Sequence, residues 1–182
     1  NTLEIQILDE LGLGGFLVTS VNLSMVGIKL KRDRVVNSTL SELTNGGVYF
    51  LLVNGEEGLK SVYIGESLNI KERLKQHIND YEVGKEPYYW DEAICFSNQK
   101  MSKGLALGLE AHLVKLSRAY NRVELLTQNI SKRTLPSSEK VMVRGMLEHI
   151  RLVLRTFGYV FLDSKLLKDA PKEGLSEEVS KL

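Results

Sequence analysis

Two tyrosines, an arginine and a histidine follow one another in an order that suits phosphate chemistry. Tyr49 and Tyr63 each lie in a short β-type run, and Arg73 and His77 follow one helical turn apart in a basic segment. An arginine guanidinium can hold a phosphate with two hydrogen bonds, and an imidazole can orient or protonate a group near neutral pH. A tyrosine near a cation or a metal-bound water can act as a general base or relay a proton. These four residues are therefore candidate catalytic groups.

Glu110 is a further candidate because it lies within the apolar stripe of a later helix. At about 100° per residue, Glu110 projects within the arc formed by apolar side chains; these are Leu105, Ala106, Leu109, Leu113 and Leu116. A carboxylate that points to the packed side is unfavourable unless it is paired, protonated or bound to a metal. We interpret Glu110 as a metal ligand or catalytic carboxylate. The alternative is a carboxylate at the rim of the arc that snorkels or pairs with Arg73.

Each candidate also has an ordinary structural interpretation. Tyrosine is favoured in strands by β propensity alone, a lone histidine is usually a satisfied half-buried side chain, and a lone arginine is usually a surface charge. The aromatic run 88–90 could stack on bases, but packing in or near a core is favoured. A basic cluster upstream is better interpreted as a solvated strand edge than as a DNA contact; it comprises Lys29, Lys31, Arg32 and Arg34.

A hairpin and two helices are needed to bring the candidate residues together. Periodicity and turn residues predict the following order of elements: strand 47–53, strand 60–65, helix 69–81, strand 91–96, helix 102–119 and a short strand near 122–126. In such a hairpin, Tyr49 and Tyr63 belong to adjacent strands and can present two hydroxyls on one face. Asn69 is expected to cap the first of these helices, with Glu72 three residues later in a capping-box arrangement.

The chain divides into four predicted segments: an N-terminal flanking element (1–45), a functional core (46–130), a C-terminal helix–strand extension (131–163) and a flexible tail (164–182). The predicted fold class is therefore α+β, with a small mixed or antiparallel β-sheet flanked by helices, a small N-terminal β element and a C-terminal helix and strand.

The two flanking segments have their own predicted elements. In the first, alternating apolar residues predict strands near 3–7 and 26–31, and a short helix is expected over 38–43. In the third, a helix is expected to begin near Ser138 and to be followed by a strand over 159–162.

Composition limits the class of protein. The chain of 182 residues is long enough for one sizeable core, and its net charge of +1 means that nucleic-acid binding would depend on a local basic patch. The single cysteine, Cys95, excludes an internal disulfide and is expected to be a buried structural thiol. No stretch approaches the roughly 20 apolar residues of a membrane span, and no secretory signal is recognisable. We therefore expect a cytoplasmic protein without membrane contact.

In order and spacing, these motifs resemble the GIY-YIG endonuclease family over about residues 46–130. The residues that carry the resemblance are Gly47-Val48-Tyr49 (with Val for the family's Ile), Tyr63-Ile64-Gly65, Arg73, His77 and Glu110. The segments before and after this core further resemble a bacterial subgroup with such flanks. The resemblance implies a metal-dependent endonuclease that hydrolyses a DNA phosphodiester by water attack, with RNA as a second possible partner.

The resemblance also implies a role for each matched residue. Glu110 would bind a single Mg²⁺ or Mn²⁺ ion, and Tyr49 or Tyr63 would help to deprotonate the attacking water. Arg73 would stabilise charge that develops on the phosphate, and His77 would assist by hydrogen bonding. One metal ion with fixed cations is a sufficient electrostatic device for this chemistry.

Two departures from the family pattern bear on activity. Some relatives have a lysine directly after Tyr-Ile-Gly, whereas this chain has Glu66, which would alter the charge balance or bind Arg73. The family also uses an asparagine after the glutamate helix; Asn129 is preferred as that catalytic residue and Asn121 stays open. The alternatives to an enzyme are a catalytically weak nucleic-acid-binding module of the same fold and a plain α/β interaction domain.

Overall fold

The computed structural model describes residues 2–8, 15–20, 23–129 and 135–163. Within these ranges seven strands form one open, mostly antiparallel sheet in the order β1-β2-β3-β6-β4-β5-β7. The strands are β1 (Leu3–Ile7), β2 (Gly15–Ser20), β3 (Leu23–Lys31), β4 (Gly46–Gly55), β5 (Gly58–Ser67), β6 (Glu92–Asn98) and β7 (Glu124–Leu125). Only β5 and β7 pair in parallel. The predicted α+β class with a mixed sheet is confirmed.

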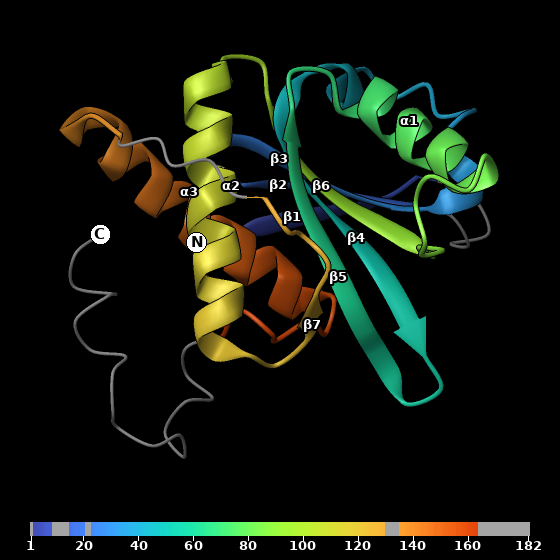
Figure 1. Ribbon diagram of the computed structural model, residues 1–182. Helices are drawn as coiled ribbons and strands as arrows, with labels where there is room; N and C mark the ends of the chain where they lie inside the picture. Colours follow the sequence, from blue (N-terminus) through green and yellow to red (C-terminus); the bar gives the residue numbers. More distant parts are fainter. Residues whose placement is uncertain (1, 9–14, 21–22, 130–134, 164–182) are drawn as a thin grey trace.

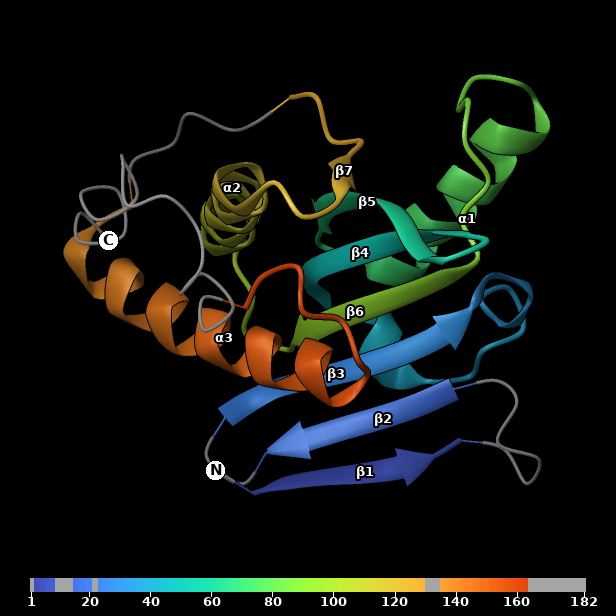
Figure 2. The same ribbon diagram turned by 90° about the horizontal axis from the view of Figure 1, so that it is seen from below.

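Three helices cover the two faces of this sheet (Figure 1). They are α1 (Ile70–Glu82), α2 (Lys103–Tyr120) and α3 (Ser137–Thr156). Apolar residues of α2 and α3 share one buried cluster, whereas those of α1 share a second cluster on the other face. Figure 2 shows the same separation, with α1 away from α2 and α3. Among the described ranges, none of these helices has the length and apolar character that a membrane crossing requires.

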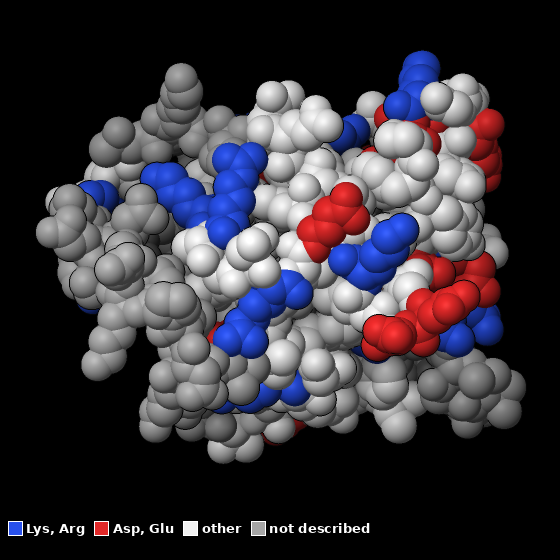
Figure 3. Space-filling view, turned by 60° about the horizontal axis from the view of Figure 1, so that its bottom comes forward, with Lys and Arg blue, Asp and Glu red and all other residues white. Residues whose placement is uncertain are grey.

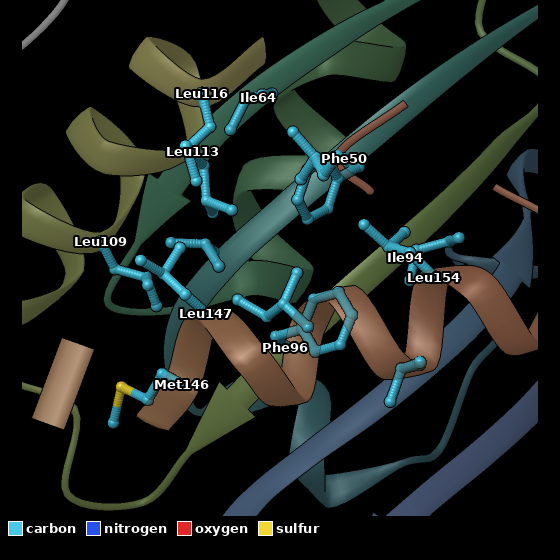
Figure 4. Close-up of a cluster of buried hydrophobic side chains, with 14 of the residues drawn as sticks. Phe50, Ile64, Ile94, Phe96, Leu109, Leu113, Leu116, Met146, Leu147 and Leu154 are labelled. Atoms are coloured by element: carbon cyan, nitrogen blue, oxygen red, sulfur yellow. The ribbon is translucent and has the colours of Figure 1, made fainter. Parts of the chain in front are cut away.

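Strand β4 is apolar along most of its length because both of its faces are covered. Its alternate residues enter the two clusters: Phe50 packs toward α2 and α3, and Tyr49 lies on the α1 face. Phe50 meets Phe96 of β6 edge to face, with ring centroids 5.9 Å apart. Figure 4 shows these rings in one cluster with labelled side chains of α2 and α3. This cluster fixes α2 against β4 and β5.

Both helices of the core segment begin with a side-chain cap, of which the one at Asn69 was predicted. The side chain of Asn69 accepts a hydrogen bond from the backbone N–H of Glu72 at 3.2 Å, which confirms the predicted start of α1. Ser102 caps α2 in the same way through Leu105 N–H at 3.1 Å. Helix α2 ends at Asn121, whose φ of 46° is left-handed.

The basic cluster before the core does not mark a strand edge, so that part of the prediction was wrong, although Lys31 and Arg34 are exposed to solvent. Strand β3 lies inside the sheet between β2 and β6, and Lys29 forms an ion pair with Glu92 at 3.3 Å. Arg32 is 7% exposed, and its guanidinium lies 4.5 Å from the ring centre of Tyr89 and 4.9 Å from that of Trp90. Tyr89 and Trp90 therefore pack around Arg32, consistent with the predicted packing role of this run, whereas Tyr88 stacks on Tyr63.

Other local predictions also differ from the structure. The helix expected over 38–43 is a 3₁₀ turn over Ser41–Thr44, and β2 was not predicted. No strand forms over 159–162, because Gly158, with φ of 84°, turns the chain back onto the sheet face instead of along an edge. Phe161 is buried there against Phe50. Cys95 is buried and free, as predicted, and the predicted tail (164–182) lies outside the described residues.

Candidate active site

Tyr49 and Tyr63 lie side by side on the α1 face of the hairpin formed by β4 and β5. Tyr49 pairs with Gly65 and Tyr63 pairs with Leu51, so the two tyrosines are diagonal neighbours. Their rings stack with centroids 6.2 Å apart. A Cβ atom at Gly65 would lie 2.4 Å from the Tyr49 hydroxyl oxygen and 2.8 Å from Tyr63 Cε1. Only glycine at this position lets both rings meet over β5.

Helix α1 brings His77 and Arg73 to the two tyrosines. His77 is 3% exposed, and its Nε2 lies 2.9 Å from the Tyr49 hydroxyl. Its ring also meets the Tyr63 ring edge to face at 5.0 Å. Arg73 lies one turn earlier, and its positive charge is close enough to act on both tyrosine hydroxyls. Four of the predicted site residues are thus in one place.

Both phenols hold their protons at neutral pH. Burial raises the pKa of Tyr49 well above its ordinary value, and burial also raises the pKa of Tyr63. The positive charge of Arg73 opposes both shifts, while the negative charge of Glu110 adds to them. Tyr49 is 1% exposed, whereas Tyr63 is partly exposed. Tyr63 is therefore the tyrosine that solvent can reach.

Glu86 is a member of the site that the sequence did not reveal. Its Oε1 atom lies 2.7 Å from His77 Nδ1 and also accepts a hydrogen bond from the Tyr88 hydroxyl. Burial alone would raise the pKa of Glu86, but the hydrogen bonds from His77 and Tyr88 outweigh it and the pKa is lowered. Glu86 is therefore a carboxylate that only accepts. No spacing rule predicts this residue, since it stands in the loop after α1.

Glu110 lies near the tyrosines although α2 covers the other face of the sheet. Burial raises the pKa of Glu110 to about 7, the nearby Glu66 carboxylate adds to the shift and Lys103 opposes it. In the described part of the chain, Glu110 has neither a hydrogen bond nor an ion pair. The same residues contain no group of three or more His, Cys, Asp or Glu side chains arranged to hold a metal ion.

Glu66 is paired from an unexpected direction. It does not bind Arg73; instead its Oε1 accepts a hydrogen bond from Lys103 Nζ at 2.5 Å, at the start of α2. The second carboxylate oxygen, Oε2, is buried and without a hydrogen-bond partner among the described residues. Lys103 therefore places a cation beside Glu66, at the position where some relatives have a lysine.

The segment that contains Asn129 follows β7 and continues alongside β5, to which it is joined by hydrogen bonds. The Thr127 hydroxyl accepts from Ile64 N–H at 2.7 Å and donates to Ile64 C=O at 2.8 Å. Arg118 of α2 donates to the carbonyls of Thr127 and Gln128, each at 3.3 Å. The segment after β7 is thus held on both sides.

A cleft of about 370 Å³ opens between α1, the loop after it and this segment. Tyr63, Arg73, His77 and Asn129 line it, whereas Glu110 does not. Asn121 is also absent from the lining, and it ends α2 instead. The geometry brings Asn129 and not Asn121 to the cleft that Tyr63 and Arg73 share.

Comparison with known families gives one match. Residues 45–123 match the family model described as the GIY-YIG catalytic domain. The matched range contains both tyrosines, α1 and Glu110, and it ends before Asn129. No curated protein and no solved structure matches the chain.

Proposed function

Because residues 45–123 form a GIY-YIG catalytic domain, and this family consists of nucleases, we propose that the chain is a metal-dependent endonuclease that hydrolyses DNA phosphodiester bonds by attack of water. The observation that carries the proposal is the shared cleft of Tyr63, Arg73 and Asn129. A half-buried carboxylate without a partner, Glu110, lies near the same tyrosines. Such hydrolysis needs hydrogen-bond donors that hold the phosphate and a carboxylate that is free to bind a metal ion.

Tyr63 is the tyrosine that we assign to the attacking water. It is partly exposed at the cleft, whereas Tyr49 is enclosed and its hydroxyl is hydrogen-bonded to His77. Since its raised pKa keeps Tyr63 protonated, this phenol would relay a proton: its oxygen accepts one from the attacking water as its own proton passes to a phosphate oxygen of the substrate. Arg73, in the same cleft wall, is placed to hold the phosphate and to stabilise its developing charge.

The described residues fit a single divalent cation. Glu110 is half buried and unpaired, its pKa is raised to about 7, and a second carboxylate oxygen, Oε2 of Glu66, is buried nearby without a partner. Burial and, after it, the charge of Glu66 raise the pKa of Glu110, and a cation between the two carboxylates would oppose both effects. Glu110 would hold Mg²⁺ or Mn²⁺, which would polarise the phosphate and stabilise the leaving oxygen. Carboxylate oxygens are ligands that suit both Mg²⁺ and Mn²⁺.

Surface charge favours local contacts over a general basic field. On the face of the molecule drawn in Figure 3, Lys and Arg side chains form separate groups with Asp and Glu side chains between them. The net charge of +1 agrees with this mixed surface. Phosphate contacts near the cleft, foremost Arg73, would therefore dominate binding.

The proposal is tested by plasmid nicking with Mg²⁺ or Mn²⁺. Glu110→Ala should lower the nicking rate at least about 100-fold, while the exposed hairpin variant Glu57→Gln should leave it unchanged. Circular dichroism checks that both variants fold. Nicking that persists in Glu110→Ala, or that needs no divalent ion, would refute the assignment.

A second candidate is a nucleic-acid-binding module of the same fold with little turnover. The observation that favours it is Glu66, an acidic residue where some relatives have a lysine. Salt-sensitive DNA binding without any nicking would support this second function. Parallel assays with single-stranded and double-stranded RNA establish whether the substrate is DNA alone.

A further inference from the structure

The loop after α1 is built to return Glu86 to the helix it has just left. Gly84 has φ of 74°, which is the left-handed conformation that ends many helices. The backbone N–H groups of Lys85 and Glu86 both donate to the carbonyl of Asp80, at 2.8 and 3.0 Å. These bonds turn the chain through the end of α1. The Glu86 side chain then reaches back nine residues to His77.

Hydrogen bonds join Glu86 to His77 and His77 to Tyr49, and Glu86 decides which atom donates in each of them. A carboxylate can only accept, so His77 Nδ1 must carry the proton that it shares with Glu86 Oε1. In the neutral imidazole, Nε2 then has no proton and accepts from the Tyr49 hydroxyl at 2.9 Å. Because the Tyr49 hydroxyl proton is donated to His77, the Tyr49 oxygen can accept a hydrogen bond from another group.

Arg73 is the group from which the Tyr49 oxygen can accept. Its guanidinium only donates, and its charge acts on the Tyr49 hydroxyl. If Nε2 of His77 instead carried the proton, His77 and Arg73 would both donate toward one phenol oxygen. With the tautomer that Glu86 selects, every donor in the order Arg73, Tyr49, His77, Glu86 has an acceptor, because the Tyr49 hydroxyl donates to His77 and its oxygen accepts from Arg73.

We propose that Glu86 is a positioning residue that fixes the tautomer of His77 and, through Tyr49, the orientation of the Arg73 guanidinium at the cleft. The consequence for catalysis rests on the proposed nuclease function, whereas the consequence for the imidazole does not. Glu86 lines the cleft, but a carboxylate repels a phosphate, so Glu86 does not itself hold the substrate. It acts through three side chains, of which only Arg73 meets the phosphate.

The burial of this network argues for a role beyond stability. Glu86 is 11% exposed and its Oε2 atom is buried without a partner among the described residues. A buried carboxylate with an unsatisfied oxygen is unfavourable compared with apolar packing of the same volume. A carboxylate at this place is explained if the direction of the hydrogen bonds matters.

The first test measures the tautomer directly. In ¹⁵N-labelled protein, ring nitrogen shifts of His77, identified by the signal lost in His77→Gln, should show a proton on Nδ1. Glu86→Met, which removes the acceptor, should move that proton to Nε2. Tyr88→Phe removes the other hydrogen bond to Glu86 Oε1 and should leave the tautomer unchanged. Unaltered signals of the distant His149 confirm folding. An unchanged His77 tautomer in Glu86→Met would overturn the proposal.

The second test measures nicking. Glu86→Met should lower the rate constant about 10-fold to 100-fold with little change in KM, whereas Glu86→Gln, which keeps an acceptor oxygen, should lose only a few-fold. Equal rates in Glu86→Met and the unmodified protein would also overturn the proposal. If the unmodified protein does not nick DNA at all, the proposed function fails, and the tautomer measurement still decides the role of Glu86 toward His77.

Discussion

The two faces of the sheet beside β5 are organised in opposite ways. On the α1 face, the buried side chains of Tyr49 and His77 and the partly buried Glu86 are joined by hydrogen bonds of 2.9 and 2.7 Å. On the α2 face, Glu66 and Glu110 raise the local negative charge, and a single ion pair from Lys103 opposes it. On the first face hydrogen bonds within the protein hold the tyrosine and histidine rings, whereas on the second face Glu110 has neither a hydrogen bond nor an ion pair among the described residues.

This difference indicates which half of the site the protein supplies and which half a ligand completes. Hydrogen-bonded side chains on rigid elements hold their geometry before substrate arrives. Two neighbouring carboxylates with too few partners are stabilised by a cation. The contrast therefore agrees with a preorganised phosphate side and a metal side, and each of the following experiments tests one of the two.

Gly65→Ala should break the α1 face most severely. The new Cβ would lie 2.4 Å from the Tyr49 hydroxyl oxygen, so the stacked rings must separate. We expect a loss of about 2–3 kcal/mol in the free energy of unfolding, measured by urea denaturation, with loss of nicking. Gly145→Ala is the matched control, since a Cβ there meets nothing within 4 Å. It should be neutral or stabilise α3 by up to about 1 kcal/mol.

Replacing each tyrosine by phenylalanine should separate stability from catalysis on the same face. Tyr49→Phe leaves Nε2 of His77 buried without a donor, so we expect a loss of about 1–2 kcal/mol in stability. Tyr63→Phe removes a hydroxyl at the open cleft and should change stability by less than about 0.5 kcal/mol, but lower nicking about 100-fold or more. The reverse pattern would show that Tyr49 meets the attacking water.

Glu110→Gln should stabilise the protein in the absence of metal. The folded state raises the pKa of Glu110 from 4.5 to about 7, so it holds this proton more tightly than the unfolded chain does. The resulting stability is complete below pH 4.5 and is lost as the pH rises through 7. After allowance for solvent screening, we expect Glu110→Gln to be about 1 kcal/mol more stable than the unmodified protein at pH 8, with little difference at pH 5.

Divalent metal should reverse that ranking. Added Mn²⁺ should raise the melting temperature of the unmodified protein at pH 8 and leave that of Glu110→Gln unchanged, because ligand binding to the native state stabilises it. Glu57→Gln controls for the loss of one negative charge at an exposed site. A Mn²⁺ shift that is equal in all three proteins would place the metal away from Glu110.

Much of the α1 face of the candidate site could be predicted because the sequence patterns that indicate it are local. Alternation and a glycine-rich turn predicted the hairpin, and the register places Tyr49 and Tyr63 on one face. Helical spacing predicted that Arg73 and His77 share a side, and the Asn69 cap marked where α1 begins. Each of these inferences depends on one helix or on two strands joined by a short turn, where backbone geometry alone decides the arrangement.

The failures have a common physical cause. Arg32 was interpreted as surface charge because its aromatic partners lie more than forty residues later in the chain. The run 159–162 is apolar enough for a strand, but it packs as a turn against Phe50. Glu86 carries no periodic signal and is recognised only from its contact with His77. Burial and pairing between distant segments override local propensity in all three cases.

The amino-acid sequence by itself determined the hairpin, the two core helices and the four side chains that the structure brings together, Tyr49, Tyr63, Arg73 and His77. Backbone periodicity and side-chain chemistry are sufficient for that much. Only the tertiary structure decided that Tyr63 rather than Tyr49 faces solvent, that Lys103 pairs with Glu66, and that Glu86 directs His77. Those outcomes depend on which side chains are desolvated together, a property of the packed sheet and helices that no single segment contains.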